Sequence, residues 1–279
     1  MNVNFSQTQR ERLKELGLKE SQINECFENL EAANNKYRKL EKEYSKKNRT
    51  VLKEFLNVEH ETLVEKISSN LKSWLIKEGY SKVSTPTIIN SRMLDKMTVT
   101  SDKPLRNQVF WVENNKCLRP MLAPNLYVVM RELRRITNDP VKIFEIGSCF
   151  RKESQGSKHM NEFTMLNFVN LGGVEEGMQM DELERMAKGS MEALGIENYE
   201  LQKESSTVYE ETLDIVVGDV ELASGSFGPH KLDANWGIFD TWVGIGFGIE
   251  RIAYIKGGYE TIARVGRSTN FLDGSTLSV

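Results

Sequence analysis

The sequence predicts an α+β fold in which a mostly antiparallel β-sheet is flanked by helices, with a helical appendage at the amino-terminal end. Two segments rich in β-branched and aromatic residues, 141–151 and 163–171, are typical of the two strands of an antiparallel hairpin. Segments 208–217, 219–226 and 241–246 have the same character and predict three further strands. Helical periodicity in the stretches between them supplies the flanking layers.

The front of the chain predicts two helices. Residues 7–16 follow Ser6, a favoured capping residue, and residues 21–47 form a longer, highly charged segment. We therefore expect two domains, a helical appendage at residues 1–57 and a main domain at residues 58–279.

The main domain begins with a helix. Apolar residues recur at three- and four-residue steps between Leu63 and Leu75, which predicts one buried helix face ending at Gly79. The remaining expected elements are a strand near Lys82, a strand over 104–112, helices over 125–136 and 180–194, and a last helix starting near Gly248.

The charge balance restricts the possible partners. A net charge of -3 excludes a generally basic nucleic-acid-binding protein. Any attraction to nucleic-acid phosphates therefore has to come from a local patch of basic residues. One basic stretch near the front of the chain is a candidate for such a patch. It is equally well explained as the solvated face of an ordinary helix. Its basic residues are Lys36, Arg38, Lys39, Lys42, Lys46, Lys47, Arg49 and Lys53.

Cysteine usage and hydropathy indicate the cellular setting. Cys26, Cys117 and Cys149 lie far apart and form no Cys-x-x-Cys pair, so we expect neither a disulfide framework nor a zinc site. The uncharged run 120–130 is too short to span a bilayer, and the first residues do not have the pattern of a leader. We expect a cytoplasmic protein with no membrane association.

Residues 150–153 suggest a phosphate contact. Alternation along a strand would place Arg151 and Glu153 on one face, where the guanidinium can clamp an α-phosphate and the carboxylate can orient an adenine amine. Taken alone, an Arg-x-Glu strand is more often a surface ion pair. The motif gains weight only from its companions.

A glycine string supplies the second motif. Gly244, Gly246 and Gly248 permit close approach of a ligand, and the helix start after them offers amide donors. The string is not a dinucleotide fingerprint, because Ile249 stands where that pattern needs glycine. Arg251, one turn into the helix, would face the outer phosphates or, alternatively, lie on the helix surface.

A third group suggests a metal. Glu221 and Ser224 are close enough to offer a carboxylate and a hydroxyl to one Mg²⁺, which takes few protein oxygens. His159, in the polar stretch between the hairpin strands, would touch the leaving phosphates or remain in solvent. The long polar stretch itself predicts a mobile loop.

Taken together, these motifs resemble class II aminoacyl-tRNA synthetases. Three motifs follow one another in the order typical of that class. The first, at residues 79–89, is a helix end that runs through glycine into a strand, and the other two are residues 150–153 and 244–251. Longer stretches closely resemble the pyrrolysyl-tRNA synthetase family over essentially the whole chain. Those stretches are 117–127, 142–147, 150–154 and 162–167.

The resemblance implies the class II catalytic fold and ATP-dependent ligation of pyrrolysine, or a related Nε-acyl-lysine, to its cognate tRNA (tRNA-Pyl) through an aminoacyl-adenylate. It implies ATP and Mg²⁺ as cofactors and a homodimer built on residues 79–89. Arg151 and Arg251 would be catalytic, and Glu221 and Ser224 would hold the metal. The implied ATP site comprises Arg151, Glu153, His159, Met160, Phe163, Glu221, Leu222, Ser224, Gly246 and Arg251.

The resemblance also implies a deep apolar pocket for the amino acid. Asn167 would hydrogen-bond the acyl carbonyl of the substrate side chain, and Tyr209 would lie on a mobile cap. The implied pocket residues are Leu122, Ala123, Leu126, Tyr127, Met130, Asn167, Val169, Tyr209, Ser226, Trp242 and Gly244.

Two departures from the family pattern leave alternatives open. The stretch Gly225-Ser226-Phe227 replaces small or β-branched residues and would add a hydroxyl and an aromatic ring beside the pocket. We expect the stand-alone type, without the separate amino-terminal tRNA-binding domain of many members, in which residues 6–53 with Arg264 and Arg267 serve tRNA. The alternatives are a class II synthetase for another, perhaps aromatic, amino acid and a non-catalytic synthetase paralogue.

Overall fold

A seven-stranded sheet forms the centre of the molecule in a computed structural model that describes residues 3–57, 59–152, 160–206 and 208–279. The pairing of β3 (Ser81–Lys82) with β7 (Val141–Phe150) is parallel, and all other pairings are antiparallel. The sheet order is β3-β7-β8-β12-β11-β10-β9, where β8 is Glu162–Leu171, β9 Glu200–Ser206, β10 Glu210–Val217, β11 Val220–Gly228 and β12 Trp242–Gly248. The predicted α+β class and the hairpin of β7 and β8 are confirmed.

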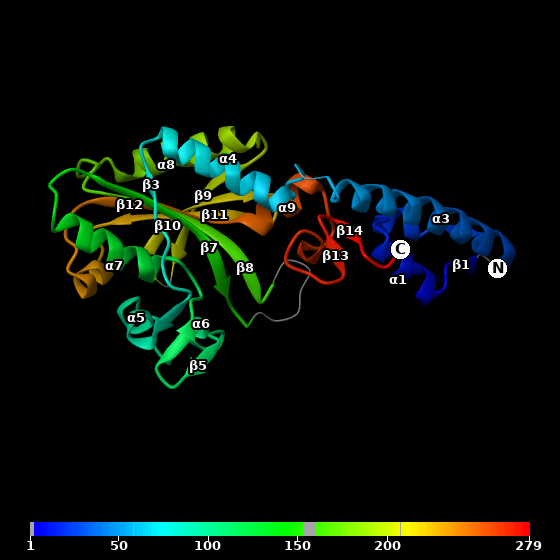
Figure 1. The fold of residues 1–279 in the computed structure, drawn as a ribbon, viewed down its shortest axis with the longest axis horizontal. Helices are drawn as coiled ribbons and strands as arrows, with labels where there is room; N and C mark the ends of the chain where they lie inside the picture. Colours follow the sequence, from blue (N-terminus) through cyan, green and yellow to red (C-terminus); the bar gives the residue numbers. More distant parts are fainter. Residues whose placement is uncertain (1–2, 58, 153–159, 207) are drawn as a thin grey trace.

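Helices α4 (Leu63–Lys77), α8 (Gln179–Leu194) and α9 (Ile249–Gly257) cover one face of this sheet (Figure 1). Helix α7 (Ala123–Arg134) lies against the other face. Alternate side chains of β8 therefore enter different layers: Phe168 joins the core under α4 and α8, and Val169 joins the core beside α7.

The helix predictions for this domain are confirmed, with boundaries shifted by one or two residues. Ile67, Leu71 and Leu75 are buried as one face of α4, and Gly79 adopts a positive φ of 86° just after the helix. Gly195 ends α8 in the left-handed conformation. The polar edge strand β9 was not predicted, because its sequence ELQKESS has no apolar alternation.

A small subdomain follows β3. It contains β4 (Ile88–Asn90), β6 (Lys116–Leu118) and β5 (Trp111–Glu113) in one sheet, with the short helices α5 (Ser91–Lys96) and α6 (Pro104–Asn107). The predicted strand at residues 104–112 is therefore wrong in its first part. The ring of Pro104 fixes φ near the helical value, and the first residue of a helix needs no amide hydrogen for a bond within the helix. Proline therefore suits that position, and the segment starts as a helix.

The appendage contains β1 (Val3–Asn4), α1 (Gln7–Glu15), α2 (Glu20–Ile23), β2 (Cys26–Phe27) and α3 (Leu30–Glu54). The predicted cap of α1 by Ser6 is confirmed. The predicted helix at residues 21–47 is wrong at both ends. The side chain of Asn29 accepts the amide of Ala32 at 2.9 Å and starts the long helix there, and no proline or glycine interrupts it before Glu54.

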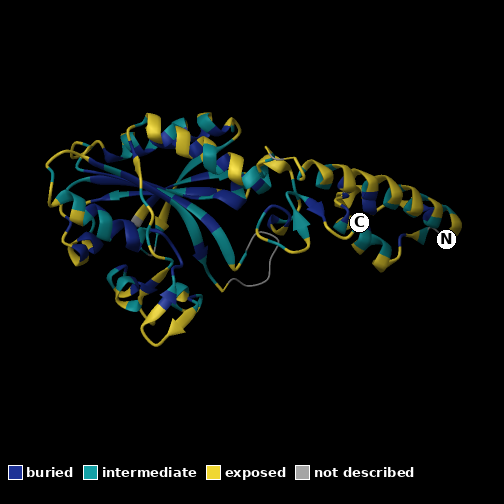
Figure 2. Ribbon diagram, in the orientation of Figure 1, coloured by how far each residue is buried: buried dark blue, intermediate teal, exposed yellow. Residues whose placement is uncertain are grey.

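The end of the sequence returns to the appendage (Figure 1). Strands β13 (Phe271–Leu272) and β14 (Ser275–Thr276) form a two-stranded sheet beside α3. Asn48 of α3 accepts the amide of Thr276 at 2.9 Å and donates to Leu16 O at 3.0 Å. The colours of Figure 2 mark buried residues in this junction as well as in the main sheet, and much of α3 is exposed.

No helix in the described part of the chain has both the length and the apolar character needed to cross a membrane.

Candidate active site

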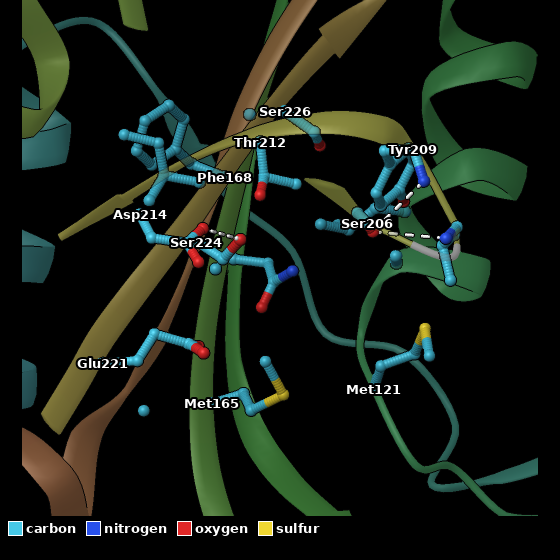
Figure 3. A pocket seen from close by; sticks show the side chains of 18 of the residues that line it. Met121, Met165, Phe168, Ser206, Tyr209, Thr212, Asp214, Glu221, Ser224 and Ser226 are labelled. Atoms are coloured by element: carbon cyan, nitrogen blue, oxygen red, sulfur yellow. Dashed lines mark hydrogen bonds between the residues drawn. The ribbon is translucent and has the colours of Figure 1, made fainter. Parts of the chain in front are cut away.

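A cavity of about 580 Å³ opens on the sheet face that carries α7. One wall is formed by residues of β8, β10, β11 and β12. The labelled residues in Figure 3 come from β8, β10 and β11, from the end of β9 and the turn after it, and from the segment before α7. One end is apolar and the other carries charged groups.

The apolar end contains most of the residues implied for the amino-acid pocket. Helix spacing places the α7 residues on one side, and strand alternation places those of β8, β11 and β12 on the other. Leu122, the residue before α7, is fully buried and does not line the cavity. The implied residues that line the cavity are Ala123, Leu126, Tyr127, Met130, Asn167, Val169, Tyr209, Ser226, Trp242 and Gly244.

Two glycines give this wall its depth. Gly244 and Gly246 pair with Val169 and Asn167 on the neighbouring strand. A Cβ atom on Gly244 would lie 2.7 Å from Phe168 O, and one on Gly246 would lie 2.9 Å from Asn167 Nδ2. A side chain at position 244 would therefore collide with the backbone of β8, and one at position 246 would displace the amide of Asn167.

Asn167 contributes an unused polar atom. Its Oδ1 is buried and has no hydrogen-bond partner among the described residues, although the side chain borders the cavity. A buried polar atom without a partner costs free energy, so this amide favours a ligand that supplies a hydrogen bond.

Tyr209 lies in the turn between β9 and β10. Its amide donates to Ser206 Oγ at 3.3 Å, as Figure 3 shows, and its ring packs edge-on to Trp242 with centroids 5.8 Å apart. Burial raises the pKa of Tyr209, and the phenol therefore stays neutral and capable of donating.

The charged end holds the two predicted arginines. Arg151 follows β7, donates from Nε to Pro120 O at 2.9 Å, and lies over the ring of Phe163 with its Cζ 5.4 Å from the centroid. Arg251 is in the first turn of α9 and donates to Glu221 O at 3.1 Å and to Glu221 Oε1 at 3.3 Å. Both guanidinium groups border the cavity.

A β-bulge explains how Glu221 and Ser224 reach the same cavity. Simple alternation would put residues three apart on opposite faces. The register with β10 shifts here, so that Ala223 pairs with Ile215 and Glu221 with Val216, leaving Leu222 as the extra residue. Leu222 turns into the core with 1% exposure and does not line the cavity.

Asp214 joins this pair and was not predicted. Its Oδ1 accepts a hydrogen bond from Ser224 Oγ at 2.6 Å, the contact drawn in Figure 3. The signal available in the sequence was Thr212-Leu213-Asp214, where the two polar residues share a strand face and the leucine faces the core. Two carboxylates and a hydroxyl match the oxygen ligands that Mg²⁺ prefers.

Glu250 is a second residue that the sequence reasoning missed. It is 2% exposed, and its two oxygens accept the amide of Thr164 at 2.9 and 2.8 Å. Burial raises the pKa of Glu250, whereas the hydrogen bonds from Thr164 and the charge of Arg267 oppose that shift.

Several expectations fall elsewhere. Glu153 and His159, with the loop predicted to be mobile, lie outside the described residues. Phe227 packs against the α4 and α8 layer instead of the pocket, because it alternates with Ser226, so the expected aromatic ring beside the pocket is wrong. Arg264 is 7% exposed and donates to backbone carbonyls, which contradicts its expected contact with tRNA.

The remaining residues implied for the ATP site meet at the charged end. They are Arg151, Met160, Phe163, Glu221, Ser224, Gly246 and Arg251.

Known proteins share this sequence and fold. Residues 46–273 match the family model of the class II core domain of tRNA synthetases (F). The crystal structure of pyrrolysyl-tRNA synthetase from Desulfitobacterium hafniense superposes with a TM-score of 0.92 and 43% sequence identity, covering 100% of both chains.

More distant relatives match over parts of the chain. The threonine–tRNA ligase of Wolbachia sp. subsp. Brugia malayi is 30% identical over 103 residues, which cover 35% of this chain and 16% of the ligase. The phenylalanine–tRNA ligase alpha subunit of Mycoplasma pneumoniae is 24% identical over 109 residues, which cover 38% of this chain and 31% of that subunit. The matches thus span less than a third of the length of these curated relatives. The full-length structural match and the family model together establish that the chain belongs to the class II tRNA synthetases and, among them, to the pyrrolysyl-tRNA synthetase family.

Proposed function

We propose that the chain activates pyrrolysine, or a related Nε-acyl-lysine, with ATP and transfers it to its cognate tRNA, tRNA-Pyl, in the cytoplasm. The observation that carries the proposal is that a deep apolar end and an end with two arginines belong to one continuous cavity. The full-length similarity to a pyrrolysyl-tRNA synthetase supports the choice of substrate.

The apolar end fits a long side chain with one polar group. Leu126, Met130 and Trp242 would enclose its methylenes, and the amide of Asn167 would meet an acyl-amide group. A standard amino acid without that group would leave the amide unpaired, which penalises its binding.

The charged end fits a triphosphate. The substrate carboxylate attacks the α-phosphorus, pyrophosphate leaves with the electrons of the broken P–O bond, and the terminal hydroxyl of tRNA then displaces AMP. The carboxylate is already a nucleophile, so the protein needs only to align the groups and neutralise charge. Arg151 and Arg251 would do this on the α-phosphate and the outer phosphates.

Glu221 and Ser224, with Asp214 beside them, are the residues that would hold Mg²⁺. The ion would add positive charge next to the phosphates. Their oxygens fit the preference of Mg²⁺, and the remaining positions would be filled by phosphate and water.

The appendage is proposed to contact tRNA. Basic residues recur along α3 at three- and four-residue steps, so they form one exposed stripe on its surface. Such a stripe would attract phosphates despite the negative net charge. The residues are Arg38, Lys42, Lys46, Arg49 and Lys53.

A homodimer is proposed through the segment at residues 79–89 and the small sheet that follows it. Ile88 is 49% exposed, and Trp111 and Val112 on the same sheet are 40% and 52% exposed. A partner subunit would cover these apolar side chains. Light scattering at micromolar concentration should give a dimeric mass, and a monomeric mass would contradict this assembly.

The reaction is tested by ATP/pyrophosphate exchange with purified protein and Mg²⁺. Pyrrolysine and Nε-acyl-lysines are compared with the twenty standard amino acids, and exchange is expected only with the former. Exchange with an aromatic or other standard amino acid would overturn the substrate class, and silence with every substrate would indicate a non-catalytic paralogue.

Arg151→Ala tests the phosphate contact. We expect the adenylation rate to fall about a hundredfold, because the transition state loses a preorganised positive charge that stabilises it. Arg135→Ala is the matched control, since Arg135 is 67% exposed at the end of α7. Exchange by Arg151→Ala at the control rate would refute the assigned role.

A further inference from the structure

Asp233 is a buried carboxylate outside the cavity wall. It lies in the 3-10 helix η1 (Lys231–Trp236) and is 1% exposed. Tyr127 Oη donates to its Oδ1 at 2.6 Å, and Trp242 Nε1 donates to its Oδ2 at 2.8 Å. A buried charge is tolerated where such donors surround it.

The two side-chain donors are walls of the apolar end. Tyr127 comes from α7 and Trp242 from β12, so one carboxylate links elements on opposite sides of the cavity. The ring of Tyr127 also stacks on Trp236 with centroids 5.2 Å apart, and Trp242 stands nearly perpendicular to it at 6.0 Å. Burial, with the nearby Tyr209 and Asp233, raises the pKa of Tyr127 and keeps the phenol a donor.

An independent observation comes from Gly228, at the end of β11. A Cβ atom there would overlap Trp242 Nε1 and lie 2.6 Å from Asp233 Oδ2. The hydrogen bond between Trp242 and Asp233 therefore requires that the backbone of β11 pass it without a side chain.

A purely local role accounts for only part of this geometry. Asp233 Oδ2 also accepts the amide of His230 at 2.6 Å, which makes it part of the cap of η1. The cap does not require a phenol on Oδ1 or an indole on Oδ2. Those two contacts connect the carboxylate to the cavity.

We propose that Asp233 is a positioning residue for the amino-acid pocket. By holding Tyr127 and Trp242 together, its carboxylate fixes the width of the apolar end and thereby the affinity for the amino-acid side chain. The identity of that ligand rests on the proposed function, whereas the positioning of the two rings does not.

The test compares Asp233→Asn, Tyr127→Phe and the double variant in ATP/pyrophosphate exchange with an Nε-acyl-lysine. Asparagine keeps the size of the side chain but replaces one acceptor oxygen with a donor. The KM for the amino acid should rise about tenfold in Asp233→Asn, and the KM for ATP should stay within about twofold. The double variant should lose less than the product of the two single losses, because both substitutions alter the same hydrogen-bonded pair.

Met191→Ala is the control for lost stability. Met191 is fully buried in α8 and does not border the cavity. We expect Met191→Ala to lower the melting temperature about as much as Asp233→Asn does. When exchange is assayed below the melting temperatures of both variants, the amino-acid KM of Met191→Ala should stay near the wild-type value. Equal increases of both KM values in Asp233→Asn, or multiplicative losses in the double variant, would overturn the proposal.

Near-ultraviolet circular dichroism separates this proposal from the proposed function. It reports the packing of the aromatic side chains, Tyr127, Trp236 and Trp242 among them, without substrate. We expect Asp233→Asn to alter the aromatic bands while Met191→Ala leaves them unchanged. An unaltered spectrum would refute the positioning role even if wild-type exchange succeeds, and an absence of wild-type exchange would refute only the proposed function.

Discussion

Glu250 has a buried carboxylate at the start of α9, where two hydrogen bonds from the Thr164 amide join that helix to β8. Burial outweighs these favourable contacts and raises the pKa of Glu250 above its ordinary value of 4.5. Below that value the side chain is protonated in both folded and unfolded chains. As pH rises, the unfolded chain ionises first, so the folded state loses stability until Glu250 ionises in the folded protein as well.

The Glu250→Gln variant tests this sign, because glutamine stays neutral. The free energy of unfolding of the wild-type protein, relative to this variant, should fall as pH rises through the window that begins at about 4.5. Denaturant unfolding across that range measures the difference, and Glu197→Gln, at an exposed position, is the control. A difference that grows with pH would contradict the raised pKa.

At the residue scale, motifs predicted what is encoded locally. The positions of Arg151 and Arg251 follow from their own strand and helix, so sequence reasoning placed both near one site. Asp214 and Glu250 acquire their surroundings from other strands, and short-range patterns do not reveal such contacts. For Phe227 the prediction failed although the rule is local. Its neighbour Ser226 faces the pocket, and adjacent residues of a strand face opposite layers, so the ring of Phe227 packs away from the pocket.

At the scale of elements, periodicity was a sufficient guide where one face is buried. Helices α4 and α8 each bury an apolar stripe, and both were predicted. The bulge at Leu222 was not predicted, because it depends on the register between β10 and β11. That one extra residue is what places Glu221 and Ser224 on the same cavity.

The cap of α4 offers a stability test at this scale. Thr62 Oγ1 accepts the amide of Glu65 at 3.2 Å, and Glu65 Oε2 accepts the amide of Thr62 at 2.8 Å. Thr62→Ala should lower the free energy of unfolding by about 1 kcal/mol, because the first turn loses its cap. Thr50→Ala, at an exposed site within α3, should change it by less than about 0.5 kcal/mol in denaturant unfolding. Equal losses would show that the cap adds nothing.

At the scale of the whole molecule, Arg264 joins the main domain to the appendage. Its guanidinium donates to Glu15 O and to Gly274 O, both at 2.7 Å, and it stacks over Phe271 with its Cζ 4.7 Å from the ring centroid. The carbonyls at the end of α1 are satisfied by this cation. No local pattern predicts such a contact, because its partners are separated by most of the sequence.

Removing this contact should separate the two steps of the proposed reaction. Arg264→Ala should loosen the appendage, raising the KM for tRNA in aminoacylation by about tenfold, while exchange without tRNA stays within about twofold of wild type. Arg135→Ala again serves as the control for loss of a surface charge. Equal losses in both assays would place the role of Arg264 in the active site instead.

The return of β13 and β14 to α3 also affects how the chain is made. The appendage helices precede the main domain in the sequence and are made before it, yet the hydrogen bond from the Thr276 amide to Asn48 can form only after residue 276 has been added. During synthesis, the side of α3 that contacts β14 therefore stays without this partner while the main domain is made. The contact between α3 and β14 therefore belongs to the late steps of folding during synthesis.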